Sequence, residues 1–334
     1  MLDDILERAR RAPARIALPE ATDPRVLDGA LAAAREGLAV PVLVGAEADL
    51  APELRRRGVG PSAIEIVDPA TSPELERYAG AWHELRRHKG MDEARALAEM
   101  AGPMLHAAMA VRQGDVDGTI AGAVATTAET VRTALQVIGR APGVETVSSF
   151  FLMEAPAGHP MAGETLVFAD CALVIAPDAN ELAQIALSAA DSAVSLLGVE
   201  PRVAMLSFST MGSARHSRVE AVARARALAA ELRPGLAIDG ELQLDAALVP
   251  AVGSVKAPGS AVAGRANVLV FPNLEAGNIG YKIAQRLGGF AAVGPVLQGL
   301  ARPANDLSRG CSAEDVAMLL AVTGVQAAAA AELL

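Results

Sequence analysis

The chain has 334 residues, of which 52% are apolar and only 3% aromatic, and its formal net charge is −10. A length above about 300 residues favours two domains over one hydrophobic core. The negative charge and the scarcity of aromatic rings argue against nucleic-acid binding, which relies on basic patches and base stacking. The remaining composition, rich in alanine, leucine and valine, predicts helices packed on sheets.

The first part of the chain alternates between short apolar runs and amphipathic segments. Residues 16–18 predict a strand, followed by a helix that Asp23 caps and Pro24 begins. Further strand-like runs are 40–45, 64–68 and 117–123. Strands that alternate with helices predict a mainly parallel sheet with helices on both faces.

The pattern changes near Gly143. The runs 148–153 and 165–176 are separated by a stretch with proline and glycine, which predicts a hairpin-like pair, so we expect a domain boundary near Gly143. The elements expected after the hairpin are a helix at 180–197, a strand from 203, a helix at 217–232, a strand from 267 and a helix at 278–287. These elements predict a second α/β domain.

Both ends of the chain predict a cytoplasmic protein with no membrane partner. The start, MLDDILERARR, is charged and amphipathic, unlike a secretory signal. The uncharged run 316–331 is shorter than a membrane span, so we expect a packed terminal helix. Cys171 and Cys311 are too few for a disulfide framework and are typical of a reducing compartment.

Residues 303–315, PANDLSRGCSAED, combine a guanidinium, hydroxyls, a thiol and carboxylates. Ser312 followed by Asp315 forms a capping-box pattern, so both side chains have a purely structural interpretation. Ser308 and Arg309 stand beside a glycine that lets a ligand approach the backbone, and they predict a site for an anion.

A second candidate anion site lies at residues 122–140, where a strand end leads through Thr126 and Thr127 into a helix. Free N–H groups at a helix N-terminus receive phosphate, although an ordinary N-cap by Thr127 explains the pattern equally well. Arg132 lies on the same helix, and Arg86 lies in a charged run that also suits a solvated face.

A third candidate consists of two loops rich in glycine, proline and serine around the strand from 267, ending in Asn278, Tyr281 and Lys282. Loops at strand ends bind ligands in α/β proteins. The sequence has no Walker A motif, no GxGxxG after the first strand and no Cys/His spacing for a metal, so no metal is expected.

Taken together, the motifs resemble the phosphate acetyltransferase family within the acetyl/butyryl phosphate transferases. The segments that carry the resemblance run in family order from about residue 16 to 325 and include IALPEATDPRVLDGA, ELRRHKGM, GAVATTAETVRTALQVIG, VAMLSFSTMGSA, LEAGNIGYKIAQRLGG and DLSRGCSAED. So many ordered motifs are far more specific than one short motif.

The resemblance implies a reversible transfer of acetyl between acetyl phosphate and coenzyme A (CoA). It implies two α/β domains with the active-site cleft between them, as in isocitrate and isopropylmalate dehydrogenases: residues 1–143 plus 299–334, and residues 144–298. It also implies a homodimer, CoA as a substrate, no tightly bound cofactor and, in some relatives, stimulation by monovalent cations.

The resemblance further implies roles for individual residues. Asp315 matches the base that takes the proton of the CoA thiol, Arg309 the cation on acetyl phosphate and Ser308 the hydroxyl that bonds in the transition state. Arg86 and Arg132 match residues that engage the 3′-phosphate end of CoA. The conflict is that a helix N-terminus lowers the pKa of a carboxyl such as Asp315, whereas a base for a thiol needs a raised one.

Three other functions fit parts of the pattern. A phosphate butyryltransferase uses the same chemistry on a longer acyl group, but the SRGCS run favours the acetyl branch. A non-catalytic acetyl-CoA-sensing module would not need Ser308, Arg309 and Asp315, and a dehydrogenase would need metal-binding aspartates. Cys311 allows a covalent acetyl-enzyme, although no histidine adjoins it in sequence.

Overall fold

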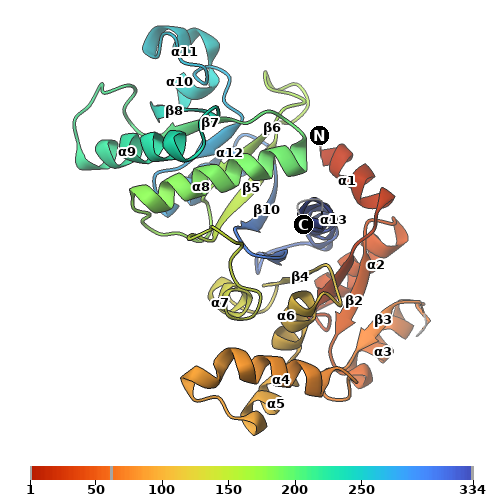
Figure 1. Ribbon diagram of the computed structural model, residues 1–334. Coiled ribbons are helices and arrows are strands. Elements are labelled where there is room, and N and C mark those ends of the chain that lie inside the picture. The colour runs from red at the N-terminus through yellow and green to blue at the C-terminus, as the bar shows by residue number, and fades with distance from the viewer. Residues whose placement is uncertain (1, 61–62, 332–334) are drawn as a thin grey trace. The chain divides into compact units, whose positions relative to one another are not determined.

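The computed structural model describes residues 2–60 and 63–331, and it consists of two compact units (Figure 1). The terminal unit comprises Ile5–Pro142 together with the chain from Leu300 onward. The central unit comprises Gly143–Gly299 and the first few residues. The predicted domains 1–143 plus 299–334 include residues 1, 61–62 and 332–334, which lie outside the described residues.

The terminal unit contains a fully parallel five-stranded sheet in the order β11-β4-β1-β2-β3. Its strands are β1 (Arg15–Leu18), β2 (Val40–Val44), β3 (Glu65–Val67), β4 (Gly118–Ala121) and β11 (Ala304–Asp306). The predicted parallel sheet is confirmed for the first four strands. β11 was not predicted, because a three-residue strand containing Asn305 and Asp306 has low strand propensity and forms by pairing with β4.

Helices cover both faces of this sheet. They are α1 (Leu2–Arg11), α2 (Pro24–Arg35), α3 (Glu47–Arg56), α4 (Leu75–Arg86), the 3₁₀ turn η1 (Arg87–Lys89), α5 (Glu93–Met100), α6 (Pro103–Gln113), α7 (Thr127–Val137) and α13 (Ala313–Ala331). Ala17, Val42 and Val44 alternate onto the face packed by α4, α5 and α6. As predicted, Asp23 caps α2 by accepting from the N–H of Arg25.

The terminal helix α13 packs inside its own unit. An added Cβ at Gly29 of α2 would lie 2.6 Å from the Ala313 carbonyl oxygen and 2.6 Å from the Val316 Cβ, so the missing side chain lets the two helices touch. Of the described residues, only α13 is long and apolar enough to cross a membrane by length and composition, and 50% of its apolar window is buried. The expected packed terminal helix is present.

The central unit contains a six-stranded sheet in the order β10-β5-β6-β9-β7-β8. Its strands are β5 (Ser148–Glu154), β6 (Thr165–Ala169), β7 (Arg202–Leu206), β8 (Ala237–Leu242), β9 (Val268–Val270) and β10 (Ala291–Gln298). β6, β9, β7 and β8 are parallel, whereas β5 pairs antiparallel with β6 and β10. The predicted hairpin-like pair is confirmed. β8 and β10 were not predicted, since both contain glycine and β10 also contains proline.

The helices of the central unit are α8 (Ala179–Ser192) with the π turn η2 (Ala193–Leu197), α9 (Ser217–Leu232), α10 (Leu244–Leu248), α11 (Pro250–Lys256) and α12 (Leu274–Arg286). Two predicted boundaries are wrong. The strand expected to reach residue 176 ends at Ala169, because the buried Asp170 carboxylate accepts from the N–H groups of residues 172–174 and turns the chain. α12 begins four residues early, because Asn273 caps it by accepting from Ala276 N.

Candidate active site

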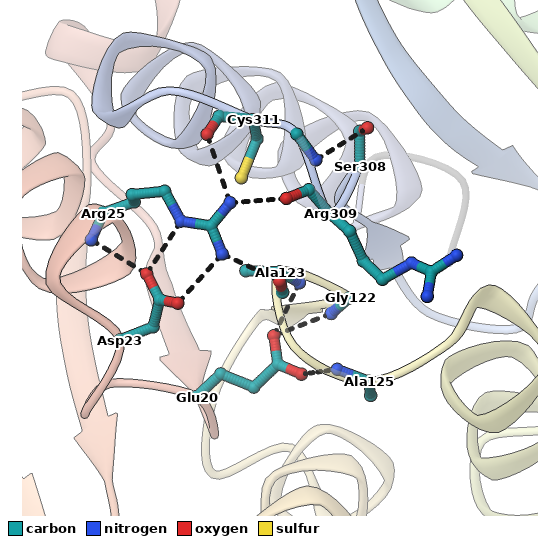
Figure 2. A network of polar contacts seen from close by, with 10 residues as sticks. Glu20, Asp23, Arg25, Gly122, Ala123, Ala125, Ser308, Arg309 and Cys311 are labelled. Atoms are coloured by element: carbon teal, nitrogen blue, oxygen red, sulfur yellow. Dashed lines mark hydrogen bonds and ion pairs between the residues drawn. The ribbon is translucent and has the colours of Figure 1, made fainter.

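The carboxyl ends of β1, β4 and β11, three neighbouring strands, carry the loops that converge in Figure 2. From β1 the chain passes outward to β2 and β3 and then returns to β4 on the other side of β1. The sheet therefore has a topological switch point between β1 and β4. In open α/β sheets, ligands bind beside the carboxyl ends of the strands at such a point.

Glu20 holds the loop that joins β4 to α7. Its carboxylate accepts hydrogen bonds from Gly122 N at 2.9 Å, Ala123 N at 2.7 Å and Ala125 N at 2.7 Å, and the residue is only 9% exposed. Bonds from N–H groups to an ionised carboxylate are stronger than neutral ones. The sequence predicts open N–H groups before α7, but the Glu20 carboxylate occupies these three.

The two threonines at this helix start are also engaged within the protein. Thr126 caps α7 in a capping box with Glu129: Thr126 N donates to Glu129 Oε2 at 2.8 Å, and Glu129 N donates to Thr126 Oγ1 at 3.3 Å. The alternative to an anion site, an N-cap of α7 by Thr127, is wrong by one residue, because the N-cap is Thr126. The Thr127 hydroxyl instead donates to Asp306 Oδ2 at 2.7 Å.

Arg25 ties the three loops together. Its Nε and Nη2 donate to the two carboxylate oxygens of Asp23 at 3.0 and 2.9 Å. Nη2 also donates to the Ala123 carbonyl at 2.9 Å, and Nη1 donates to the Arg309 carbonyl at 2.6 Å and more weakly to the Cys311 carbonyl at 3.5 Å. These bonds hold the pKa of the Asp23 carboxyl below its ordinary value. One planar fork thus sets the backbone of all three loops.

Ser308 and Arg309 lie exposed on the loop that Arg25 holds. Ser308 Oγ accepts from Gly310 N at 3.2 Å, which turns the chain after β11. The Arg309 guanidinium points away from Arg25 in Figure 2 and makes no hydrogen bond or ion pair within residues 2–60 and 63–331. A guanidinium that has no hydrogen-bond partner in the protein and stands on a fixed backbone is suited to bind an anion through two parallel hydrogen bonds.

Asp315 forms the capping box that the sequence predicted. Ser312 N donates to Asp315 Oδ2 at 2.9 Å, and Asp315 N donates to Ser312 Oγ at 3.2 Å. Both residues are exposed at the start of α13. The cap uses the Oδ2 oxygen of the carboxylate.

Cys311 is a poor nucleophile in this setting. The residue is buried, and burial raises the pKa of its thiol despite the opposing effect of the Arg25 cation, while the carboxylates of Asp315 and Asp23 add smaller increases. A higher pKa leaves less thiolate near neutral pH. The geometry therefore disfavours the covalent alternative.

The two arginines that the resemblance assigned to CoA, Arg86 and Arg132, lie on different helices of the terminal unit. Arg86 ends α4 with its guanidinium carbon 5.3 Å from the centre of the Trp82 ring, and its Nε is buried without a hydrogen-bond partner among the described residues. Arg132 is exposed on α7. Trp82 is held by its indole N–H, which donates to Glu99 at 2.9 Å. Arg86 therefore has a rigid aromatic support.

Asn278, Tyr281 and Lys282 belong to the central unit and lie on one helix, α12, within the helix that the sequence predicted at 278–287. Lys282 Nζ donates to Asn278 Oδ1 at 2.6 Å, and Asn278 Nδ2 donates to the Cys171 carbonyl at 3.1 Å. The Tyr281 ring stacks on Phe151 at 4.0 Å. These contacts bring the three predicted residues together within the central unit.

Sequence reasoning missed Glu20, Arg25 and Asp306 as parts of this site. The first two lie in the segment LPEATDPR, whose motif carried the resemblance without a role for either residue. Asp306 lies in PANDLSRG, a segment in which the sequence predicts a role in the site only for Ser308 and Arg309. No spacing rule connects residues 25 and 309, because the pairing of β1, β4 and β11 creates their proximity.

An α/β unit with an unpaired guanidinium at its switch point has the form of an anion-binding enzyme site. A family profile described as phosphate acetyl/butaryl transferase matches residues 1–324. The phosphate acetyltransferase of Paracoccus denitrificans is 52% identical over 326 residues, 97% of this chain and 98% of that protein. Two solved structures also match, each over 98% of this chain and 99% of that chain. The EutD phosphotransacetylase from Staphylococcus aureus has 43% identity and a TM-score of 0.89, and a phosphotransacetylase from Streptococcus pyogenes has 42% and 0.91. The chain belongs to the phosphate acetyl/butaryl transferase family.

The bonds of Arg25 predict that Arg25→Lys, which keeps the charge and loses the fork, destabilises the protein by about 1–3 kcal/mol. It should also speed amide hydrogen exchange in residues 307–312. Urea unfolding and exchange mass spectrometry measure the two effects. Arg10→Lys is the control, because the Arg10 Nε makes one exposed bond to the Glu36 carbonyl. Equal behaviour of the two variants would contradict the role given to Arg25.

Proposed function

We propose that this chain is a phosphate acetyltransferase, which transfers acetyl reversibly between acetyl phosphate and CoA. The identity of 52% to an enzyme of that name over nearly the whole length supports the assignment. The observation that carries it is the Arg309 guanidinium, which stands unpaired among the described residues while its own carbonyl is held by Arg25 at 2.6 Å. Its charge is therefore available to the phosphate of acetyl phosphate.

The reaction we propose is direct attack of the CoA sulfur on the acetyl carbon in a ternary complex, with thiolate character developing as the thiol proton leaves. The carbon–sulfur bond forms, the bond from the acetyl carbon to the phosphate oxygen breaks, and phosphate departs with that electron pair. Arg309 and the Ser308 hydroxyl donate to the oxygens on which negative charge grows, which stabilises the transition state more than the ground state.

Asp315 is the group that we propose to receive the thiol proton. A thiol with a pKa near 8.5 is only a few per cent thiolate at pH 7, so a base placed beside it accelerates attack by about 10²- to 10⁴-fold. Asp315 also caps α13, where its Oδ2 accepts from Ser312 N at 2.9 Å. We propose that proton transfer accompanies attack rather than precedes it, since a carboxylate is in general a far weaker base than a thiolate.

The substrate contacts divide among the remaining cations. We propose that Arg86 and Arg132 bind the 3′-phosphate end of CoA, since Arg86 is supported by Trp82 and Arg132 is exposed on α7. We retain Lys282, Asn278 and Tyr281 as further contacts of acetyl phosphate. Thr126 and Thr127 build the start of α7, because both hydroxyls already bond within the protein.

We propose that each compact unit is one domain, with the boundaries 1–143 plus 299–334 and 144–298. We also place the enzyme in the cytoplasm, because Cys171 and Cys311 are both free thiols. CoA is a substrate, and we expect no tightly bound cofactor. Stimulation by a monovalent cation remains a prediction for a rate assay with and without potassium.

We propose a homodimer with an interface on α12. Ile279, Ile283 and Leu287 are spaced by four residues and are 58%, 52% and 84% exposed, so they form an apolar stripe that the described residues leave uncovered. A second copy, related by a two-fold axis, would bury the same stripe on both sides.

The dimer proposal predicts that Ile283→Asp sediments as a 34.1 kDa monomer while the wild type sediments at twice that mass. A charge on the stripe cannot be buried without a partner, so association is lost. Leu97→Asp, at an exposed apolar position of α5, is the control and should remain dimeric. A monomeric wild type would refute the proposal.

The proposed activity predicts acetyl-CoA formation from acetyl phosphate and CoA in a coupled assay. Arg309→Ala should lower kcat by at least about 10²-fold with the fold intact by circular dichroism, because the charge on the leaving phosphate loses its fork. Arg302→Ala, in the same segment, should have a kcat near that of the wild type.

Comparison of kcat/KM for acetyl, propionyl and butyryl phosphate tests the acyl range. Bound CoA without turnover would indicate a sensing module instead.

For Asp315, the cap and the base can be separated. Asp315→Asn still caps a helix but cannot accept a proton, so kcat should fall by about 10²- to 10⁴-fold while the thermal midpoint stays close to that of the wild type. Rate assays and thermal unfolding measure the two properties. A variant with unchanged kcat would leave Asp315 with the structural role alone.

A further inference from the structure

Asp306 is a buried carboxyl group that the proposed chemistry does not use. It is the last residue of β11, two residues before Ser308, and is 1% exposed. Its Oδ2 accepts from the Thr127 hydroxyl at 2.7 Å, whereas its Oδ1 is buried without a hydrogen-bond partner among the described residues. Such an unsatisfied oxygen is costly in a folded protein and calls for an explanation.

The neighbouring loop is shaped to admit this carboxyl. Gly122 has a φ of +106°, and a Cβ added there would lie 2.2 Å from Asp306 Oδ1 and 2.7 Å from the Leu307 carbonyl oxygen. Only glycine tolerates both the backbone conformation and the contact. The position of Asp306 is therefore built into the β4–α7 loop.

The charges around Asp306 disfavour its ionised form. Glu20, which holds the same loop, is the charged group that acts on it, and it is repulsive. From α7, Asp306 is faced by the hydroxyls of Thr127 and Thr130, while Glu129 bonds to Thr126. Burial, and secondarily Glu20, raise the pKa of Asp306 to about 6 from 3.8. Above that pH, ionisation of Asp306 therefore lowers the stability of the folded protein. An asparagine at this position would not ionise and would not lower it.

We propose that Asp306 is a positioning residue, which fastens the loop carrying Ser308 and Arg309 to the N-terminus of α7 through the Thr127 hydroxyl. The bond joins two segments 179 residues apart in sequence. Arg132 lies on α7. The same bond therefore sets the spacing between Arg309, proposed to bind acetyl phosphate, and Arg132, proposed to bind CoA. The inference rests on the proposed function and adds a residue to it.

The ionisation of Asp306 then affects the rate. A hydroxyl bonds more strongly to a carboxylate than to a neutral carboxyl group. The fastening is therefore tighter above the pKa than below it. The catalytic loop should be held best above about pH 6, where Asp306 is ionised.

The test is the pH profile of kcat/KM for acetyl phosphate with saturating CoA. In the wild type, kcat/KM should rise through an apparent pKa near 6. Asp306→Asn should lose this inflection and be slower by roughly tenfold at pH 7.5, where the carboxylate is the stronger acceptor. Thr127→Val should be slowed by a similar factor, and Thr127→Ser should restore the rate to within about twofold.

The variants also test whether the two residues act through each other. The double variant Asp306→Asn with Thr127→Val should be no slower than the slower single variant, because both substitutions remove the same bond. Thr119→Val is the matched control: its buried hydroxyl donates to the Ala17 carbonyl at 2.9 Å, and its loss should leave the inflection in place. Additive losses, or an unchanged inflection in Asp306→Asn, would overturn the inference.

A wild type without acetyltransferase activity would refute the proposed function, and the inference would then be decided by urea unfolding. Because the pKa of Asp306 is about 6 in the folded protein against an ordinary value of 3.8, the wild type loses stability as pH rises across that interval. The stability of Asp306→Asn relative to wild type should grow over the same interval and then level off. A difference independent of pH would overturn the placement of an ionising carboxyl there.

Discussion

The arrangement of the candidate site depends on one planar guanidinium. Arg25 bonds Asp23 on its own loop, the Ala123 carbonyl on the second and the Arg309 carbonyl on the third. Each loop follows a different strand of one parallel sheet, so the sheet brings the loops near and the fork sets their final spacing. A lysine could supply the charge but not the divergent donors, because its ammonium is a point charge on a flexible stem.

The residues that order the loops differ from the residue that offers a charge to a ligand. This difference explains how a chain with net charge −10 presents a site for an anion. Glu20 occupies the N–H groups before α7, and Arg25 is neutralised by Asp23, so neither competes for substrate. Arg309 has no hydrogen-bond or ion-pair partner among the described residues, so its charge stays open to an anion. Glu20 and Arg25 thus order the backbone of the loops, whereas Arg309 supplies the positive charge for an anionic ligand. The buried Asp306 fits the same scheme, since its carboxylate bonds to the Thr127 hydroxyl of α7 while Arg309 is exposed.

The parts of the fold that sequence predicted share a local origin. The strand at Ile16, the Asp23 cap and the helix from Pro24 depend on hydrophobic period and capping within a few residues. β11 and β10 escaped prediction because Asn305, Asp306 and Pro295 disfavour strands, and only their neighbours make them strands. The early start of α12 followed from a single cap at Asn273, which local pattern alone did not distinguish from a loop residue.

The sequence by itself determined the α/β class, the family and the residue types that carry the proposed chemistry, because ordered motifs and apolar periods are properties of the chain. It also identified Ser308, Arg309 and Asp315 as candidates. Only the tertiary structure decided which groups are available. It showed that Glu20 fills the N–H groups before α7, that the Thr127 hydroxyl is bonded to Asp306 and that Arg309 is unpaired. The reason is physical: the carbonyl partners of Arg25 lie 98 to 286 residues away in sequence, and only the pairing of parallel strands makes them neighbours.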